Sequence, residues 1–107
     1  MNRIYKPLPQ VKYRPLPKCL TIKQSKIEGL GLFAKERIMK DTVLGVSHVK
    51  LESAEDGYLR TPLGGFINHS DDPNCVKWCE DDKYFVKTIR PIHTGEELFL
   101  KYTFYDV

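Results

Sequence analysis

The chain lacks any long hydrophobic run. None of its apolar stretches approaches the roughly 20 residues that a membrane-spanning helix requires. The first ten residues, MNRIYKPLPQ, have no apolar core behind their basic residues, as a secretory leader would. Cysteine is also scarce, and three cysteines without a leader argue for reduced thiols rather than a disulfide framework. These absences predict a cytoplasmic protein that is not bound to a membrane.

Helical periodicity is missing as well. No segment carries apolar residues at helical spacing for long, and only 53–59 could form a turn or two of helix. Short alternating or apolar segments predict strands instead, at 19–24, 32–34, 42–46, 49–51, 76–79, 83–89 and 98–102. The third and fourth of these are expected to be separate pieces, broken around Ser47 and His48. The acidic turn Glu80-Asp81-Asp82 predicts a hairpin, so the fold class is mostly β.

The charge of the chain is uneven. A formal net charge of +3 is too small to indicate a nucleic-acid binder, and no direct nucleic acid is expected as a partner. Residues 1–18 nevertheless form a basic, proline-rich arm without an acid, ahead of a domain at 19–107. The arm repeats Tyr-Lys-Pro-Leu-Pro as Tyr-Arg-Pro-Leu-Pro, which favours extended backbone. It could bind an aromatic groove in a partner, or it could cover a sheet edge of its own domain.

The sequence does not match two common kinds of binding site, a structural zinc site and a dinucleotide-binding loop. Cys75 and Cys79 are four positions apart without a second close pair, which is a poor match to structural zinc spacing, so no metal is predicted. On a strand both cysteines would face the same side, where we expect the core. Gly29-Leu30-Gly31 lacks the third glycine and the helix of a dinucleotide fingerprint. On its own it indicates a hairpin turn that could also approach a ligand closely.

Two polar segments carry chemistry. Asn68-His69-Ser70 directly follows the apolar pair Phe66-Ile67, which is expected to place the amide and the imidazole against an apolar interior. Buried amides and imidazoles need hydrogen-bond partners, and a polar ligand could supply them. About twenty-five residues later, Gly95-Glu96-Glu97-Leu98 leads into an aromatic segment that contains Tyr102. Taken alone, the first would be a stabilised turn and the second a piece of core.

Three segments together resemble a SET domain, the fold of protein lysine methyltransferases. They are SKIEGLGLFA at 25–34, FINHSDDPNC at 66–75 and GEELFLKY at 95–102, in the order of that family, and the resemblance covers about residues 19–106. It implies several small curved sheets, with the last strand passing the Asn-His-Ser segment in a knot-like crossing. It also implies that S-adenosylmethionine binds on one face and that the target lysine enters through a narrow channel from the other.

The resemblance also implies roles for individual residues. Tyr102 would be the catalytic tyrosine. The cofactor would be held by two groups, the turn residues Glu28, Gly29, Leu30 and Gly31 and the polar residues Asn68 and His69. The substrate channel would be lined by Phe66, Leu100, Phe104 and Tyr105. Leu100 stands where the family commonly has Phe or Tyr, so the number of methyl groups added is not predicted, and Asp71 stands where a cysteine is common.

The predicted function is transfer of a methyl group from S-adenosylmethionine to the side-chain amine of a protein lysine. Alignment of amine and methyl group can contribute roughly 7–11 kcal/mol to such a displacement. A lysine pKa of about 10.4 would be lowered by an apolar channel and by the sulfonium charge. The alternative is a catalytically weak SET-fold interaction module that binds a partner through its basic arm.

The segment between the first and second motifs is short. Only 36 residues separate Gly31 from Asn68, which leaves little surface for gripping a substrate peptide. Either a second copy of the chain completes the groove, as a homodimer, or the arm and the tail at 104–107 close it.

Overall fold

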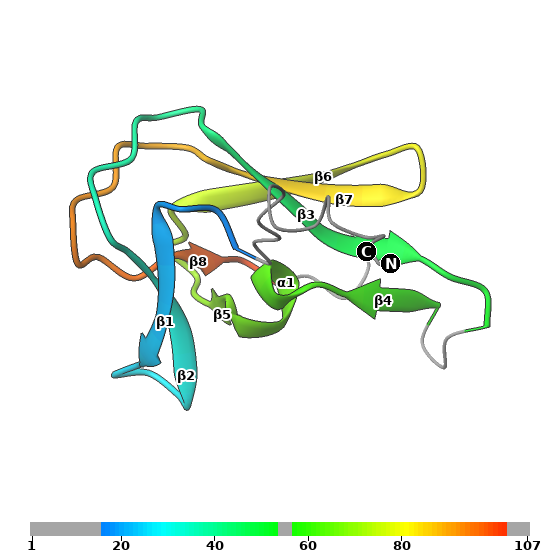
Figure 1. Ribbon diagram of the computed structural model, residues 1–107, viewed down its shortest axis with the longest axis horizontal. Coiled ribbons are helices and arrows are strands. Elements are labelled where there is room, and N and C mark those ends of the chain that lie inside the picture. Colours follow the sequence, from blue (N-terminus) through cyan, green and yellow to red (C-terminus); the bar gives the residue numbers. More distant parts are fainter. Residues whose placement is uncertain (1–15, 54–56, 103–107) are drawn as a thin grey trace, which may run out of the picture.

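The computed structural model describes residues 16–53 and 57–102, which form three small sheets and one short helix (Figure 1). The elements in chain order are β1 (Leu20–Gln24), β2 (Leu30–Ala34), β3 (Val43–Lys50), β4 (Tyr58–Arg60), α1 (Pro62–Phe66), β5 (Asn68–His69), β6 (Cys75–Glu80), β7 (Lys83–Thr88) and β8 (Phe99–Leu100). The expected mostly β fold of several small sheets is confirmed. No helix in these two ranges is long and apolar enough to cross a bilayer.

Strands β1 and β2 form an antiparallel hairpin, with Leu20 opposite Ala34 and Gln24 opposite Leu30. Its turn is closed by a hydrogen bond of 2.7 Å from the Ser25 amide to the Gly29 carbonyl. Gly29 has a φ of 49°, in the left-handed region that glycine adopts without a Cβ penalty. The prediction of a hairpin turn at this glycine is therefore confirmed.

The largest sheet has the strand order β4-β3-β7-β6, with β6 and β7 at the top of Figure 1 and β4 lower, on the right. The β6–β7 hairpin is joined by Asp81 and Asp82, which both have positive φ, at 52° and 66°. Two consecutive positive φ values are typical of the primed turns whose twist matches that of paired strands. The hairpin predicted from the acidic turn is confirmed.

The predicted break at Ser47 and His48 is wrong, because β3 continues through both residues. The irregularity takes the form of a register shift against β7 between Val46 and His48. Ser47 is fully buried there, and its hydroxyl donates to the Tyr84 carbonyl at 3.3 Å. A buried hydroxyl with a partner is tolerated inside a strand, so the polar residue marks a bulge rather than an end.

The expected helical turn at 53–59 is also wrong where the structure describes that segment, since Tyr58–Arg60 is strand β4. The helix lies just beyond it, at α1. Thr61 caps it by accepting a hydrogen bond from the Gly64 amide, and Pro62 occupies its first turn. A Cβ at Gly64 would overlap the Ser47 carbonyl, so this glycine lets the helix pack directly on β3. That packing sets the position of the segment that follows, Ile67 and Asn68.

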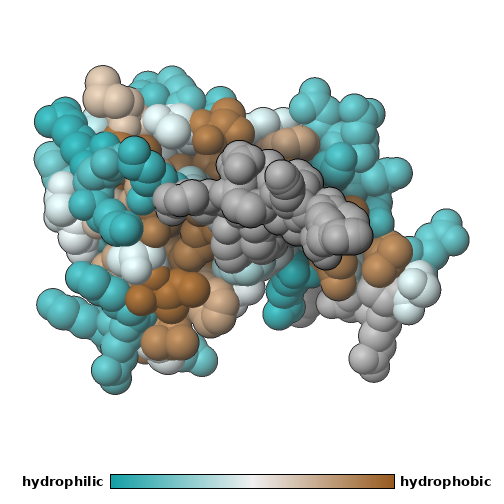
Figure 2. Space-filling model, in the orientation of Figure 1, coloured by the Kyte–Doolittle hydropathy of each residue, from teal (hydrophilic) through white to brown (hydrophobic). Residues whose placement is uncertain are grey.

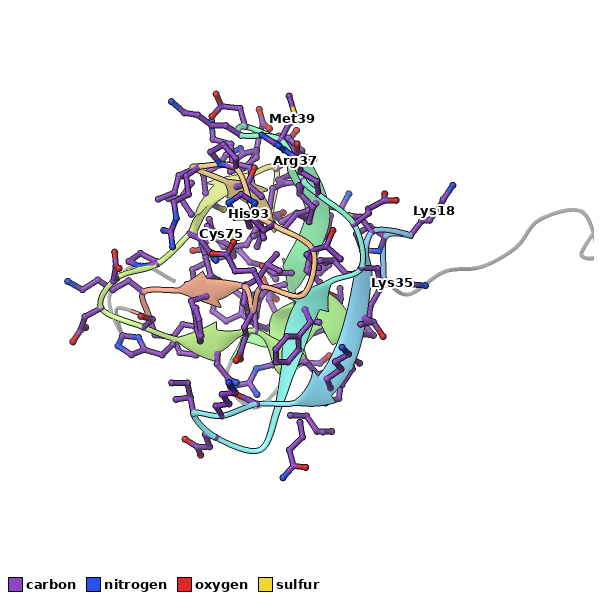
Figure 3. The ribbon with its side chains drawn as sticks, turned by 90° about the vertical axis from the view of Figure 1, so that its left-hand side faces the viewer. Lys18, Lys35, Arg37, Met39, Cys75 and His93 are labelled. Carbon is purple, nitrogen blue, oxygen red and sulfur yellow. The ribbon has the colours of Figure 1, made fainter. Side chains whose placement is uncertain are left out.

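The core lies between the large sheet, the β1–β2 hairpin and α1. Its buried members are Leu20, Leu32, Ala34, Ile38, Leu44, Leu63, Ile67, Cys75, Val86, Ile92, Leu98 and Leu100. Cys75 sits in the interior, while Lys18 and Lys35 project outward beside β1 and β2 (Figure 3). Cys79 is exposed, so the expectation that both cysteines face the core is wrong for Cys79, near the end of β6.

Most of the proline-rich arm lies outside the described residues. Only positions 16–18 are described, and Leu16 packs against the core while being partly exposed. The idea that the arm covers a sheet edge, and the boundary at residue 18, stay predictions.

Candidate active site

The centre of the candidate site is the pairing of β5 with β8. The two strands run parallel, with Asn68 opposite Phe99 and His69 opposite Leu100, and they lie side by side in Figure 1. The Ser70 amide extends the pairing by donating to the Leu100 carbonyl at 2.9 Å. The expectation that the last strand passes the Asn-His-Ser segment is thus confirmed.

Tyr102 is fixed to the β5 segment at two points. Its phenol donates a hydrogen bond to the Ile67 carbonyl, and its backbone amide donates to His69 Nδ1 at 2.8 Å. Burial raises the pKa of the Tyr102 phenol above its ordinary value, although the nearby Arg60 charge acts in the opposite direction. The phenol is therefore neutral at physiological pH and can act as a hydrogen-bonding group rather than as a base.

His69 is more exposed than the sequence suggested, with 43% of its side chain accessible to solvent. The expected burial of this imidazole against an apolar interior is wrong, because the ring lies at the surface beside Tyr102, with centroids 5.7 Å apart. Since Nδ1 accepts from the Tyr102 amide, the neutral ring carries its proton on Nε2. Nε2 lies 3.2 Å from Asp71 Oδ1, which can accept that proton's hydrogen bond.

Asn68 connects this strand pair to the β1–β2 turn. Its side-chain nitrogen lies 3.2 Å from both the Glu28 and the Leu30 carbonyl oxygens, which accept its hydrogen bonds. Segments that lie forty residues apart in the chain thereby meet, and the turn residues expected to hold the cofactor face Asn68. The structure thus brings together the two groups of residues that the sequence assigned to one ligand.

Glu97 was not singled out in the sequence, yet it joins the same cluster. It is only 9% exposed, and its two carboxylate oxygens accept hydrogen bonds from the Ser25 hydroxyl at 2.8 Å and from Asn68 Nδ2 at 2.9 Å. A Cβ at Gly31 would overlap this carboxylate. Gly31, in strand β2, therefore lies in close contact with the Glu97 carboxylate, which would have to move to admit a Cβ, whereas an added Cβ at Gly29 would meet no atom within 4 Å.

Asn74 fixes the last strand from the other side. It is 1% exposed, its side-chain nitrogen donates to the Glu97 carbonyl at 2.8 Å, and its side-chain oxygen accepts from the Phe99 amide at 2.7 Å. In the sequence, Asn74 is not distinguishable from the other turn-forming residues of Asp72-Pro73-Asn74. Its structural role depends on a partner more than twenty residues away.

Two of the four residues expected to line the substrate channel are described by the structure, and they differ in burial. Phe66 is partly buried and packs against the core. Leu100 is 2% exposed and belongs to the core itself, and Phe104 and Tyr105 lie outside the described residues. Exposed apolar side chains do occur near the site, including Ile27 and Leu30 in the hairpin turn, at 65% and 49%. On the face shown in Figure 2, hydrophobic surface gathers in the left-hand half, with hydrophilic surface around it.

Metal-binding groups do not gather in the described part of the chain, where no three His, Cys, Asp or Glu side chains come together. The Asn68 amide and the buried Glu97 carboxylate contact the β1–β2 turn segment, and the Tyr102 phenol contacts the Ile67 carbonyl, directly before β5.

The fold is similar to solved structures of methyltransferases. A Plasmodium falciparum protein described as a histone methyltransferase shares 22% identity over 82% of this chain and 96% of its own, with a TM-score of 0.66. The methyltransferase domain of human PR domain-containing protein 2 shares 18% over 86% and 82%, with a TM-score of 0.63. A chain of the Chaetomium thermophilum Polycomb Repressive Complex 2 shares 22% over 79% of this chain and 15% of its own, with a TM-score of 0.64.

These likenesses establish the fold, and the sequence itself establishes the family. No curated protein sequence matches the chain. The family model described as SET domain matches residues 48–103, just over half of the 107 residues, and includes both the Asn-His-Ser and the Gly-Glu-Glu-Leu segments. The chain belongs to the SET-domain family.

Proposed function

We propose that this SET domain is a protein-lysine N-methyltransferase that uses S-adenosylmethionine. The observation that supports this most is the parallel pairing of β5 and β8, which holds the Tyr102 phenol beside the segment that contains Asn68 and His69. The tyrosine hydroxyl can orient the amine, while the polar residues of β5 and the turn that contains Gly29 can bind the methyl donor. The methyltransferases with similar folds support the reaction class.

The residues of the site fit the cofactor. The turn at Gly29 offers backbone without a side chain in the way. Asn68, His69 and the backbone of 28–31 would hold the amino-acid end and the adenine. When bound, S-adenosylmethionine supplies a methyl group on a sulfonium, which is open to displacement by an amine. The displacement needs a neutral amine, and it does not require a metal ion to activate that amine.

The chain's own residues would supply alignment. The transfer forms a C–N bond as the C–S bond breaks, and the lysine ammonium must first release a proton to solvent so that nitrogen offers a lone pair. The neutral Tyr102 phenol donates its proton to the Ile67 carbonyl in a hydrogen bond. Its oxygen can then accept a hydrogen bond from an N–H group of the amine and so orient the amine. Correct placement of two reacting groups can contribute about 7–11 kcal/mol to the barrier reduction.

The substrate is proposed to be a protein or peptide that presents a lysine. The residues 1–18, the tail at 104–107 or a second copy of this chain would complete the surface that grips it. A homodimer and a cytoplasmic location remain proposals, which sedimentation of the purified protein and imaging of the tagged chain would test.

The direct test is transfer of a labelled methyl group from S-adenosylmethionine to a panel of proteins, with mass spectrometry of the modified residues. We expect label on lysine side chains and none when the chain is omitted. Cofactor binding measured by calorimetry without transfer to any protein would contradict catalysis and favour the alternative, an interaction module. Absence of cofactor binding by folded protein would overturn the proposed function altogether.

A further inference from the structure

Glu97 is a buried carboxylate whose side-chain hydrogen bonds, among the residues that the structure describes, come from neutral groups. Its side chain is satisfied by two neutral donors, the Ser25 hydroxyl and the Asn68 amide. No lysine, arginine or histidine in the described ranges 16–53 and 57–102 forms an ion pair with it. A buried charge without a countercharge is costly, so a positive group brought near it is stabilised.

The position of Glu97 also determines which way the Asn68 amide faces. Three atoms surround Asn68 Nδ2 at 2.9–3.2 Å, namely Glu97 Oε2 and the Glu28 and Leu30 carbonyl oxygens. All three are acceptors only, so the amide nitrogen must point toward them and the oxygen must point away. Asn68 Oδ1 accepts no hydrogen bond from any residue that the structure describes, and it can therefore accept one from a ligand.

The carboxylate organises the β1–β2 turn as well. Ser25 donates its hydroxyl proton to Glu97 Oε1 and accepts hydrogen bonds at its oxygen from the Ile27 and Glu28 amides, at 3.0 and 3.4 Å. The hydroxyl thus ties the turn to the last part of the chain. One carboxylate consequently fixes both of the segments expected to hold the cofactor's amino-acid end.

We propose that Glu97 is a positioning residue for the cofactor, and that it selects a ligand whose amino-acid end carries an ammonium group. It acts through Asn68, whose amide it turns so that Oδ1 accepts from that ammonium, and its own negative charge favours the positive group. The inference rests on the proposed function, because it names how the same site recognises S-adenosylmethionine.

The test compares two ligands that differ in the amino-acid end. S-Adenosylhomocysteine retains the ammonium, whereas methylthioadenosine contains the nucleoside and sulfur but no amino acid. Their dissociation constants are measured by calorimetry for the wild type, for Glu97→Gln, and for the matched control Glu96→Gln. Glu96 is the neighbouring acid, which lies partly exposed and pairs with Arg90 rather than with the site.

We expect Glu97→Gln to weaken S-adenosylhomocysteine about tenfold, as the loss of one favourable charge interaction does, and to leave methylthioadenosine within roughly twofold. Glu96→Gln should leave both affinities near those of the wild type. Equal weakening of both ligands by Glu97→Gln would mean a purely structural role and would overturn the proposal, as would unchanged affinity for both.

A second variant covers the case in which Glu97→Gln unfolds, as judged from its melting temperature without ligand. Ser25→Ala removes one donor to the carboxylate and keeps the charge, and it should weaken S-adenosylhomocysteine selectively by about threefold. Equal affinities of this variant and the wild type for S-adenosylhomocysteine would count against the proposal. A wild-type protein that binds neither ligand would instead overturn the proposed function, so the two failures are distinguishable.

Discussion

The Asn74 side chain holds the Phe99 backbone in place, because its oxygen accepts from the Phe99 amide at 2.7 Å while its nitrogen donates to the Glu97 carbonyl at 2.8 Å. The amide thus serves both partners in a position that is 1% exposed. Strand β8 contains only two residues, so its own ladder cannot fix its place. The Asn74 side chain therefore holds the strand that leads to Tyr102 in place, in addition to the pairing of that strand with β5.

Asn74→Ala should destabilise the protein by about 2–4 kcal/mol, because it leaves a buried amide proton and a buried carbonyl without partners. The free energy of unfolding from urea denaturation measures this. Asp72→Ala, on an exposed residue of the same loop, is the control and should stay within about 0.5 kcal/mol. A change of that small size in Asn74→Ala would contradict the assigned role.

Gly31→Ala should destabilise the protein by about 1–3 kcal/mol, because the added methyl group overlaps the Glu97 carboxylate and the contact between hairpin and site must open. Gly65→Ala is a matched substitution in α1, where the new methyl group meets no atom within 4 Å. It should be neutral or stabilising by up to about 1 kcal/mol, since alanine favours helix over glycine. Urea denaturation of both variants tests the contrast, and equal effects would refute it.

The sequence was sufficient to predict features that depend on a local pattern, such as the Asp81-Asp82 hairpin, which follows from an acidic turn between two apolar segments. The pairing of the distant strands β5 and β8 was predictable only from the SET-domain motifs. Helix α1 was missed because Gly64 and Gly65 disfavour helix. The structure requires Gly64 for a reason that no local pattern contains, namely contact with the Ser47 carbonyl on β3.

A site residue could be predicted from the sequence only where the resemblance to a family motif assigned a role to that residue. Glu96 and Glu97 are identical side chains next to each other, yet Glu96 is partly exposed and Glu97 is buried. The difference comes from the bridge that pairs Glu97 with Phe33 of β2, which decides the face on which each carboxylate lies. Likewise, the exposure of His69 follows from the place of β5 at the surface, which apolar neighbours in the sequence do not reveal.

Tyr102→Phe should lower the rate of methyl transfer by roughly 100-fold, because the phenol that would orient the amine is lost. Cofactor affinity should change little, since the ring and the Tyr102 backbone amide remain in place. Labelled transfer gives the rate and calorimetry the dissociation constant. Tyr84→Phe, on strand β7, removes a hydroxyl away from the site and should retain activity. Near-normal transfer by Tyr102→Phe would remove this residue from its proposed role.

The buried thiol of Cys75 should make the free energy of unfolding decrease in alkaline solution. Burial raises the pKa of its thiol from 9.0 to about 12, with Arg90 lowering and Glu96 raising it by smaller amounts. The unfolded chain therefore releases this proton at lower pH than the folded protein. The stability that the neutral thiol contributes is complete below pH 9 and is lost as pH rises toward 12, by at most about 1.4 kcal/mol per pH unit.

Replacing Cys75 removes this contribution to the pH dependence. Cys75→Ala should be less stable than the wild type at pH 8, because it leaves a small cavity, but its stability should decline less steeply between pH 9 and 10. Cys79→Ala, on an exposed cysteine, should follow the wild-type slope. Urea denaturation of the three proteins at both pH values measures the slopes. If Cys75→Ala loses stability with pH as steeply as the wild type does, the buried thiol does not govern the alkaline decline, and other groups with raised pKa, such as the Tyr102 phenol, must carry it.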